Sequence, residues 1–203
     1  MDDTILTLIE LEDFFQNITT RMLGFDDTLA ENQGKVRISF NTDGLPPPII
    51  TDNLTYIRVF SVDDPVTRFV EKSKTSKNET LANKIVKYYR VHEVSWAFYG
   101  SNSFDNADLI RSLFLDSTND YHAELINKNL GLILDVPAPI RIPELIQGKW
   151  WSRTDLKIRF NEQVTRISDV PYLQSANIII KTDTGKTEEI NITENSTDYL
   201  PVV

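Results

Sequence analysis

Cysteine is absent from this 203-residue sequence, and both histidine (two residues) and glycine (seven) are scarce. Without cysteine the chain has no disulfide framework, no thiolate nucleophile and no Cys-based zinc or iron site, which fits folding in a reducing compartment. Phosphate-binding loops need several glycines at fixed spacing, and the sequence has no such loop, no nucleophile elbow and no HExxH helix. These absences favour a non-catalytic protein that needs no cofactor.

Long hydrophobic runs are missing too, since none approaches the ~20 apolar residues that span a bilayer. The start, Met1-Asp-Asp-Thr4, is the opposite of a basic signal-peptide start. We therefore expect a protein that is made in a cytosol and has no membrane partner.

Positive charge is in deficit, with 21 Lys and Arg against 30 Asp and Glu, a formal net charge of -9. Lys and Arg dominate binding to phosphate backbones, so general nucleic-acid affinity is not expected. An acidic surface suits an ordinary soluble protein, and it also suits one that must let DNA slide past.

What the sequence does contain is a clear alternation of helical and strand periods. Amphipathic spacing predicts an N-terminal helix from about Thr4 to Leu23, ended by Gly24, and two sequential helices at 103–115 and 119–129. Strands are predicted at 35–40, 55–62, 84–99, 132–134, 153–166 and, as a final hairpin, 176–181 with 187–192. His92, in the long strand, is expected to be the cross-strand partner of a carboxylate.

The segments between these elements are expected to be extended or irregular. Residues 66–83, with the basic run Lys72–Lys77, are predicted to form a loop, a hairpin tip or a protruding arm. Leu45–Pro48 is interpreted as a rigid spacer, Asp169–Pro171 as a turn, and 194–203 as a flexible tail. We expect one domain, 1–203, comprising an N-terminal segment 1–24 and these arms. Its fold class is α+β: an antiparallel or mixed sheet with the two sequential helices packed on one face, plus the N-terminal helix.

The strand-to-helix junction from Val94 to Phe114 is the stretch around which the rest is predicted to be organised. The chain turns at Gly100, and Ser103 is predicted to be the N-cap of the helix, with Asp105 favourable in its first turn. Phe104 is predicted to pack inward, so Phe104→Ala should cost about 3 to 5 kcal/mol if the ring is buried.

Candidate catalytic or binding groups are few. Asp120 and Glu124 share a helical face, but His122 between them points elsewhere, so a metal site is an alternative to a solvated helix face. Three cations at 157, 159 and 166 could form a DNA track, but interleaved acids make them better partners for charged neighbours. Of the adjacent Trp150 and Trp151, one is expected in the core and the other exposed as an interface anchor.

The blocks between about Lys84 and Asn177 resemble the neck-terminator (tail-terminator-like) proteins of tailed bacteriophages. The resemblance rests on an ordered set of short motifs: Tyr99-Gly100-x-Asn102-Ser103-Phe104-Asp105-Asn106-Ala107, Leu130-Gly-Leu132, Asp135-Val-Pro137, Arg141-Ile-Pro-Glu-Leu145, Trp150-Trp151-x-Arg153-x-Asp155-Leu156, Arg159-Phe160-Asn161 and Thr165-Arg166. One departure is Ser101, where a proline is expected, and it makes the turn more flexible.

The resemblance implies a non-enzymatic virion protein that forms a ring, usually hexameric, at the phage neck. Such a ring ends the tail tube and joins it to the head completion proteins around a channel through which DNA passes without specific binding. The implied partners are further copies of the chain, the tail tube protein, connector or adaptor proteins and the sheath protein. Alternatives are another connector component (adaptor or stopper), a baseplate protein, or a small metal-dependent hydrolase using Asp120, His122 and Glu124.

The motif match also selects residues for roles in the fold or the interface. Packing and turn-setting are assigned to Phe104 and Asn106. Interface contact is assigned to Trp150, Trp151, Arg153, Asn161 and Glu162. The alternative is that all of them serve only the fold of the monomer.

Overall fold

A computed structural model describes residues 3–26, 28–29, 31–39, 52–76, 81–171, 175–181, 185 and 187–193. The chain divides into two compact units. The larger comprises Asp3–Val70 and Lys87–Thr165, and the smaller comprises Met1–Asp2, Glu71–Val86 and Arg166–Val203. Strands β4 (Leu81–Tyr99) and β9 (Arg153–Pro171) each supply residues to both units. The expectation of one domain stays a prediction.

Helix α1 (Leu8–Met22) begins at a capping box. The Thr7 hydroxyl accepts from the Glu10 amide, and the Glu10 carboxylate accepts from the Thr7 amide, so two free donors of the helix start are satisfied. Acidic Glu10 in the first turn and basic Arg21 in the last complement the helix dipole. The predicted N-terminal helix is confirmed, starting a turn later than expected because the cap lies at Thr7.

The larger unit is built on a sheet with strand order β1-β2-β4-β9-β5, and β6 also pairs with β9. The β1–β2 pair is parallel, whereas the β2–β4, β5–β9 and β6–β9 pairs are antiparallel. The strand bounds are β1 Val36–Ile38, β2 Leu54–Val62, β4 Leu81–Tyr99, β5 Leu130–Leu132, β6 Ile140–Arg141 and β9 Arg153–Pro171. A separate hairpin joins β7 (Glu144–Ile146) to β8 (Lys149–Trp151).

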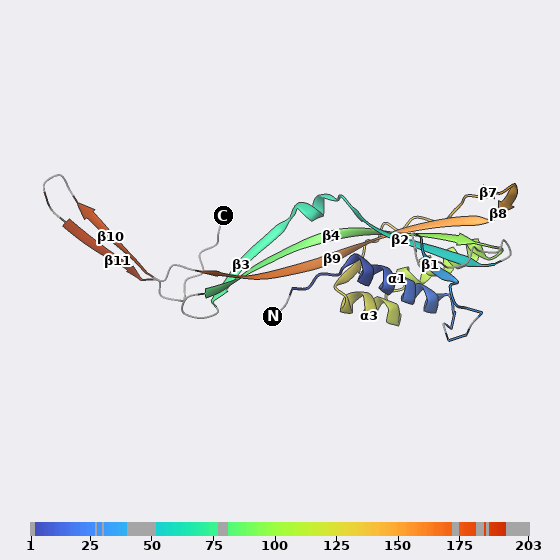
Figure 1. Ribbon diagram of the computed structural model, residues 1–203, viewed down its shortest axis with the longest axis horizontal. Coiled ribbons are helices and arrows are strands. Elements are labelled where there is room, and N and C mark those ends of the chain that lie inside the picture. Colours follow the sequence, from blue (N-terminus) through green and yellow to red (C-terminus); the bar gives the residue numbers. More distant parts are fainter. Residues whose placement is uncertain are drawn as a thin grey trace. The chain divides into compact units, whose positions relative to one another are not determined.

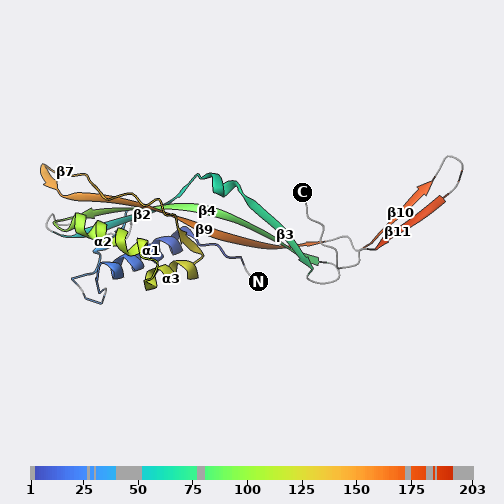
Figure 2. The ribbon, with the colours of Figure 1, turned by 180° about the vertical axis from the view of Figure 1, so that it is seen from behind.

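Helices α1, α2 (Ser103–Leu115) and α3 (Asp120–Asn127) lie on the same face of this sheet (Figures 1 and 2). The α+β class and the packing of the two sequential helices on one face are confirmed. Asn119, predicted to lie in the cap cluster of the second helix, is its N-cap and accepts from the His122 amide.

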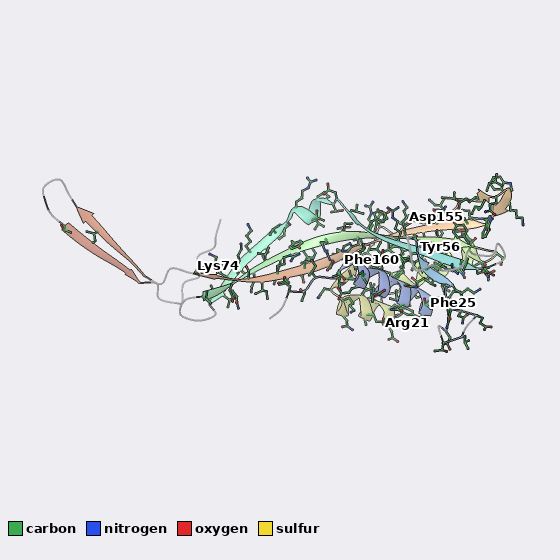
Figure 3. All side chains as sticks on the ribbon, viewed as in Figure 1. Arg21, Phe25, Tyr56, Lys74, Asp155 and Phe160 are labelled. Carbon is green, nitrogen blue, oxygen red and sulfur yellow. The ribbon has the colours of Figure 1, made fainter. Side chains whose placement is uncertain are left out.

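The core between helices and sheet is a cluster of aromatic rings. Phe160 of β9 is labelled in Figure 3. The centroid of its ring lies 4.8 Å from that of Phe15 of α1, and Phe114 of α2 contacts both Phe160 and Trp96. The buried indole of Trp96 donates to the Thr19 hydroxyl of α1 at 3.0 Å, so its polar atom is satisfied. These contacts join two helices to the two longest strands.

The described part of the smaller unit consists of strands, apart from a bend at residue 185. β3 (Val70–Ser76) begins at its boundary and pairs with β4, while β10 (Ser175–Lys181) and β11 (Thr187–Thr193) form an antiparallel pair that confirms the predicted final hairpin.

Several predicted boundaries are wrong. Of the alternatives for 66–83, the described residues favour a hairpin over an irregular loop, because a 3-10 turn (Pro65–Arg68) is followed by β3, which pairs with β4. The turn expected at Asp169–Pro171 is the end of β9, and the short strand expected at 132–134 lies at 130–132. The spacer at 45–48 and the tail at 194–203 lie outside the described residues.

The strand-to-helix junction also differs in detail. The N-cap of α2 is Asn102, and Ser103 is the first helical residue, buried with its hydroxyl 3.1 Å from that of Ser152. The Phe104 side chain is 45% exposed, so its predicted inward packing is wrong and a core cost for Phe104→Ala is not expected. Asp105 is the acidic residue of the first turn, as predicted.

Gly100 is required at this junction for two separate reasons. Its φ of +102° is disfavoured for residues with a side chain, and an added Cβ would lie 2.7 Å from the Asp52 carbonyl oxygen and 2.9 Å from the Asn53 Cα. Both neighbours are backbone atoms, which cannot rotate away. The loop before β2 is thereby packed directly against the end of β4.

We expect Gly100→Ala to lower the free energy of unfolding by about 3 kcal/mol or more, because backbone strain and a backbone clash add. Gly24→Ala is the matched control, since Gly24 has a φ of +70° but no atom within 4 Å of an added Cβ. It should cost only about 1 to 2 kcal/mol. Urea unfolding followed by circular dichroism measures both; equal losses would contradict the close approach at Gly100.

Candidate functional site

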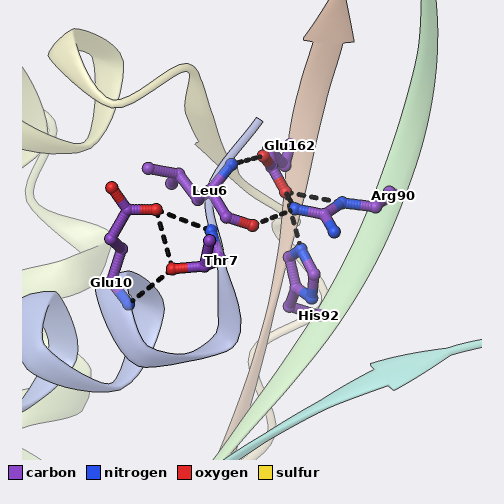
Figure 4. Close-up of polar contacts among 6 residues, drawn as sticks. All are labelled: Leu6, Thr7, Glu10, Arg90, His92 and Glu162. Atoms are coloured by element: carbon purple, nitrogen blue, oxygen red, sulfur yellow. Dashed lines mark hydrogen bonds and ion pairs between the residues drawn. The ribbon is translucent and has the colours of Figure 1, made fainter. Parts of the chain in front are cut away.

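A buried carboxylate, Glu162, joins β9 to β4 on the helix side of the sheet (Figure 4). Its side chain is 1% exposed. One oxygen, Oε2, lies 2.9 Å from the Arg90 Nε and 2.8 Å from the His92 Nε2. The predicted pairing of His92 with a carboxylate across strands is confirmed, and Glu162, predicted as an interface residue, lies inside the monomer.

The same carboxylate fixes the chain that leads into α1. Glu162 Oε1 accepts from the Leu6 amide at 2.8 Å, and the Arg90 guanidinium donates to the Leu6 carbonyl at 2.6 Å (Figure 4). Two residues earlier, Thr4 and Thr165 exchange backbone hydrogen bonds of 2.9 and 3.2 Å. The N-terminal segment is thus attached to β9 by polar bonds before the helix starts.

The pKa of Glu162 lies below its ordinary value. Burial raises the pKa of this carboxyl, but hydrogen bonds from His92, the Leu6 amide and Arg90 outweigh that effect. The folded protein therefore favours the ionised form, whose charge is balanced by the adjacent guanidinium.

The opposite face of the sheet carries charged and aromatic side chains instead of helices. In β4 the buried Phe98 packs into the helix-side core, so the alternation of the strand turns Tyr99 to the other face. Tyr56 and Asp155 are labelled in Figure 3, and the Tyr56 ring contacts Tyr99 edge-on. We call this the helix-free face.

A polar network at one end of the helix-free face holds the β7–β8 hairpin. The Tyr99 hydroxyl donates to Glu144 of β7 at 2.8 Å, Arg153 donates to Glu144 at 3.1 Å and to Asp155 at 2.7 Å, and Trp151 of β8 packs edge-on against Tyr99. Burial of the phenol and its bond to Glu144 raise the pKa of Tyr99 to about 12. The same bond to Tyr99 lowers the pKa of Glu144.

A second ion-pair group lies further along the helix-free face. Glu93 of β4 accepts from Arg159 at 3.1 Å and lies 3.5 Å from Lys157, both of β9. Charges of opposite sign on adjacent strands stabilise the pairing of the strands. The interpretation of these cations as partners of acids is therefore confirmed for Lys157 and Arg159.

The β7–β8 hairpin presents apolar side chains to solvent. Gln147 and Gly148, with φ of 49° and 75°, form its two-residue turn. Leu145 and Trp150 are directly paired across the strands, and Trp150 is 69% exposed while Trp151 on the other face packs on Tyr99. The expectation that the two tryptophans face opposite ways is confirmed, but the expectation that one of them lies in the core is wrong, because Trp151 is only half-buried, on Tyr99 of the helix-free face.

The structure separates the residues predicted from the motifs. Arg153, Trp151 and Trp150 meet at the hairpin, whereas Glu162 is buried elsewhere. Asn161 lies opposite Gly131 of β5, where an added Cβ would be 2.4 Å from the Asn161 Oδ1. Asn106, predicted to set the turn, is half-buried in the first turn of α2. The side chain that bonds to the turn before α2 is that of Asn53, whose Oδ1 accepts from the Asn102 amide at 3.1 Å.

The candidate metal residues of α3 do not converge in the structure. Glu124 is engaged by Arg21, whose Nη1 donates to Oε1 at 2.8 Å. In the part of the chain that is described, no group of three or more His, Asp or Glu side chains could hold a metal ion. The geometry gives no support for the hydrolase alternative.

Sequence reasoning missed Arg90, Glu144 and Leu145 as members of these clusters. Arg90 could have been found from the polar Glu162 in an otherwise apolar face, because a buried carboxylate requires a cationic or donor partner. The hydrogen bonds of Glu144 and the cross-strand pairing of Leu145 depend on how the hairpin folds back on the sheet. No residue pattern in the sequence predicts that contact.

Comparison with known protein families identifies the family of this chain. The family model described as phage neck terminator protein matches residues 10–185. No curated protein is similar enough to count as a match. Among the described residues, no helix is both long and apolar enough to cross a membrane.

We expect Glu162→Gln to lower the free energy of unfolding by about 3 kcal/mol, because it leaves Arg90 beside a neutral, buried partner. Glu124→Gln is the matched control, since the Arg21–Glu124 pair is also carboxylate to guanidinium but exposed. It should cost less than about 1 kcal/mol. Urea denaturation measures the free energy of unfolding of both variants. Similar losses would show that the buried ion pair contributes no more to stability than the exposed one.

The lowered pKa of Glu162 predicts a dependence of stability on pH. The contribution of the ionised carboxylate is complete above its ordinary pKa of 4.5 and is lost as the pH falls below that value, because the unfolded chain then takes up the proton first. Between about pH 5 and pH 3 the unfolding free energy of wild type should therefore fall more steeply than that of Glu162→Gln. If the unfolding free energies of the two proteins fell equally with pH, Glu162 would not be the source of the pH dependence.

Proposed function

Because the chain belongs to the phage neck terminator family, we propose that this structural neck protein assembles into a ring that ends the tail tube. The ring, a hexamer in the proposal, joins the tube to the head completion proteins around the DNA channel. Its partners are further copies of the chain, the tail tube protein, the connector or adaptor proteins and the sheath protein. Its location is the neck of the virion, after synthesis in the host cytoplasm.

The observation that carries the proposal is the exposed, rigidly held β7–β8 hairpin. Leu145 and Trp150 form an apolar surface on one side, while Tyr99, Glu144 and Arg153 fix the other. Aromatic residues on a pre-organised element are typical anchors of protein interfaces, since little conformational entropy is lost on binding. Such a surface supports assembly with another protein.

The β10–β11 hairpin gives independent support. In the part of the chain that is described, these strands pair only with each other. An isolated two-stranded hairpin is marginally stable in water and gains stability from a neighbour. We assign it the role of an arm that contacts an adjacent subunit.

Net charge supports the proposed passage of DNA. The chain has a formal charge of -9, and the cations Lys157 and Arg159 are paired with Glu93. A ring of such subunits repels the phosphate backbone and does not retain it. Specific DNA binding is not part of the proposal.

The experiment that tests the ring is multi-angle light scattering of the purified protein, followed by negative-stain microscopy. We expect a closed assembly of defined subunit number, and labelled antibody on intact particles at the junction of head and tail. Label at the head vertex or baseplate would favour an adaptor, stopper or baseplate component. A protein found in infected cells but never in particles would overturn the proposal.

We expect Trp150→Ala to reduce assembly while changing the unfolding free energy by less than about 0.5 kcal/mol, because the side chain is mostly solvent-exposed. Trp151→Ala is the matched control. It removes the packing on Tyr99 and should destabilise the hairpin by about 1 to 3 kcal/mol. Light scattering and urea denaturation are measured on both. Unchanged assembly of Trp150→Ala would exclude this residue as an anchor.

A further inference from the structure

The segment 140–151 carries an unusual concentration of exposed apolar side chains. They are Ile140, Ile142, Leu145 and Trp150, and we call them the hairpin patch. Soluble monomers rarely leave a large apolar patch uncovered, and such patches mark sites of association. The bonds of Glu144 to Tyr99 and Arg153 fix the hairpin part of this patch, and backbone pairing with β9 fixes Ile140 and Ile142.

The exposed charge beside the hairpin patch is positive, although the chain as a whole is acidic. Segment 140–151 contains three charged residues, Arg141, Glu144 and Lys149. Glu144 is bonded to Tyr99 and Arg153, whereas Arg141 and Lys149 are exposed. The surface that covers this patch should therefore combine apolar groups with carboxylates.

The outer side of α2 has that composition. Its exposed residues include apolar Phe104, Leu109 and Leu115 and acidic Asp105 and Asp108, which we call the α2 stripe. The one cation of α2, Arg111, is turned to the backbone and donates to the carbonyls of Val136 and Pro137 at 3.2 and 3.1 Å. The α2 stripe is thus apolar and acidic.

The two surfaces lie on opposite sides of the sheet. The hairpin packs through Trp151 on Tyr99 of the helix-free face, whereas α2 covers the other face through Ala107, Ile110 and Phe114 (Figure 2). They do not meet within one protomer. A contact between them joins different patches of two copies, which is the head-to-tail type that builds rings.

We propose that the hairpin patch of one copy docks on the α2 stripe of the next copy. Trp150 packs against Phe104, and Lys149 and Arg141 face Asp105 and Asp108. The occupant of the patch is a second copy of this chain, because charge and apolar character are complementary between the two surfaces. This inference rests on the proposed ring and names its subunit contact.

The absence of cysteine allows a direct test by disulfide cross-linking. Lys149→Cys and Asp108→Cys are purified separately, mixed and oxidised mildly. We expect a cross-linked dimer in the mixture and little in either variant alone, whereas the double variant gives a ladder of oligomers. The matched control is a mixture of Lys149→Cys with Asp63→Cys, because Asp63 is exposed but lies outside both surfaces. We expect no cross-linked dimer in this mixture.

The outcomes separate this contact from the ring itself. A wild-type protein that forms rings but whose mixed variants do not cross-link overturns the contact alone. Efficient coupling of Lys149→Cys to itself also overturns it, because that contact is symmetric. A wild-type protein that stays monomeric at every concentration overturns both the contact and the ring. Coupling of Lys149→Cys in virions solely to a different phage protein assigns the patch to that protein and refutes the inference.

Charge exchange provides a second measurement that does not depend on oxidation. Lys149→Asp should weaken self-association about tenfold, as like charges then face each other. Asp108→Lys should have a similar effect, and the double variant should recover most of the loss. Additive losses in the double variant would overturn the pairing of these two positions.

Discussion

The packing of three helices against one face of the sheet is the constraint on which the rest of the structure depends. Phe15, Trp96, Phe114 and Phe160 meet in one aromatic cluster, so α1, α2, β4 and β9 cannot shift independently. Because the three α-helices of the described residues lie on that side, the other face is stabilised by contacts between side chains of the strands themselves. The ion pairs of Glu93 with β9 are the result. The hairpin that projects its tryptophan is held on the same helix-free face.

Much of this fold could be predicted from the sequence because alternation along a strand reports burial directly. The strand from Arg153 onward alternates through buried side chains, and the same alternation places Glu162 on the inner face. The motif match assigns Glu162 to an interface, but the register of its strand turns the side chain inward, and it is buried in the monomer. The prediction that Phe104 packs inward was wrong because of its position in the helical register. The buried stripe of α2 passes through Ser103, Ala107 and Ile110, and Phe104 is rotated away from it by one residue.

The candidate site could be predicted only where it depends on neighbours in sequence. Adjacent residues of a strand face opposite ways, so the opposite orientations of Trp150 and Trp151 followed from the pair alone, whereas the expectation that one of them lies in the core was wrong. The contact of Tyr99 with Glu144 joins positions 45 residues apart. It arises from the return of the chain through a proline-containing segment, and no periodicity in the sequence encodes that return.

Rigidity of the hairpin bears directly on whether head-to-tail contacts close into a ring. A contact between different patches gives a ring when the rotation between neighbours divides a full turn, and an open filament when it does not. Small angular errors accumulate from one subunit to the next, so closure requires that both patches be fixed within the protomer. The α2 stripe is fixed by the aromatic core, and the hairpin patch by Glu144, Arg153 and the Trp151–Tyr99 contact. The polar network of the helix-free face therefore sets the angle of the proposed subunit contact.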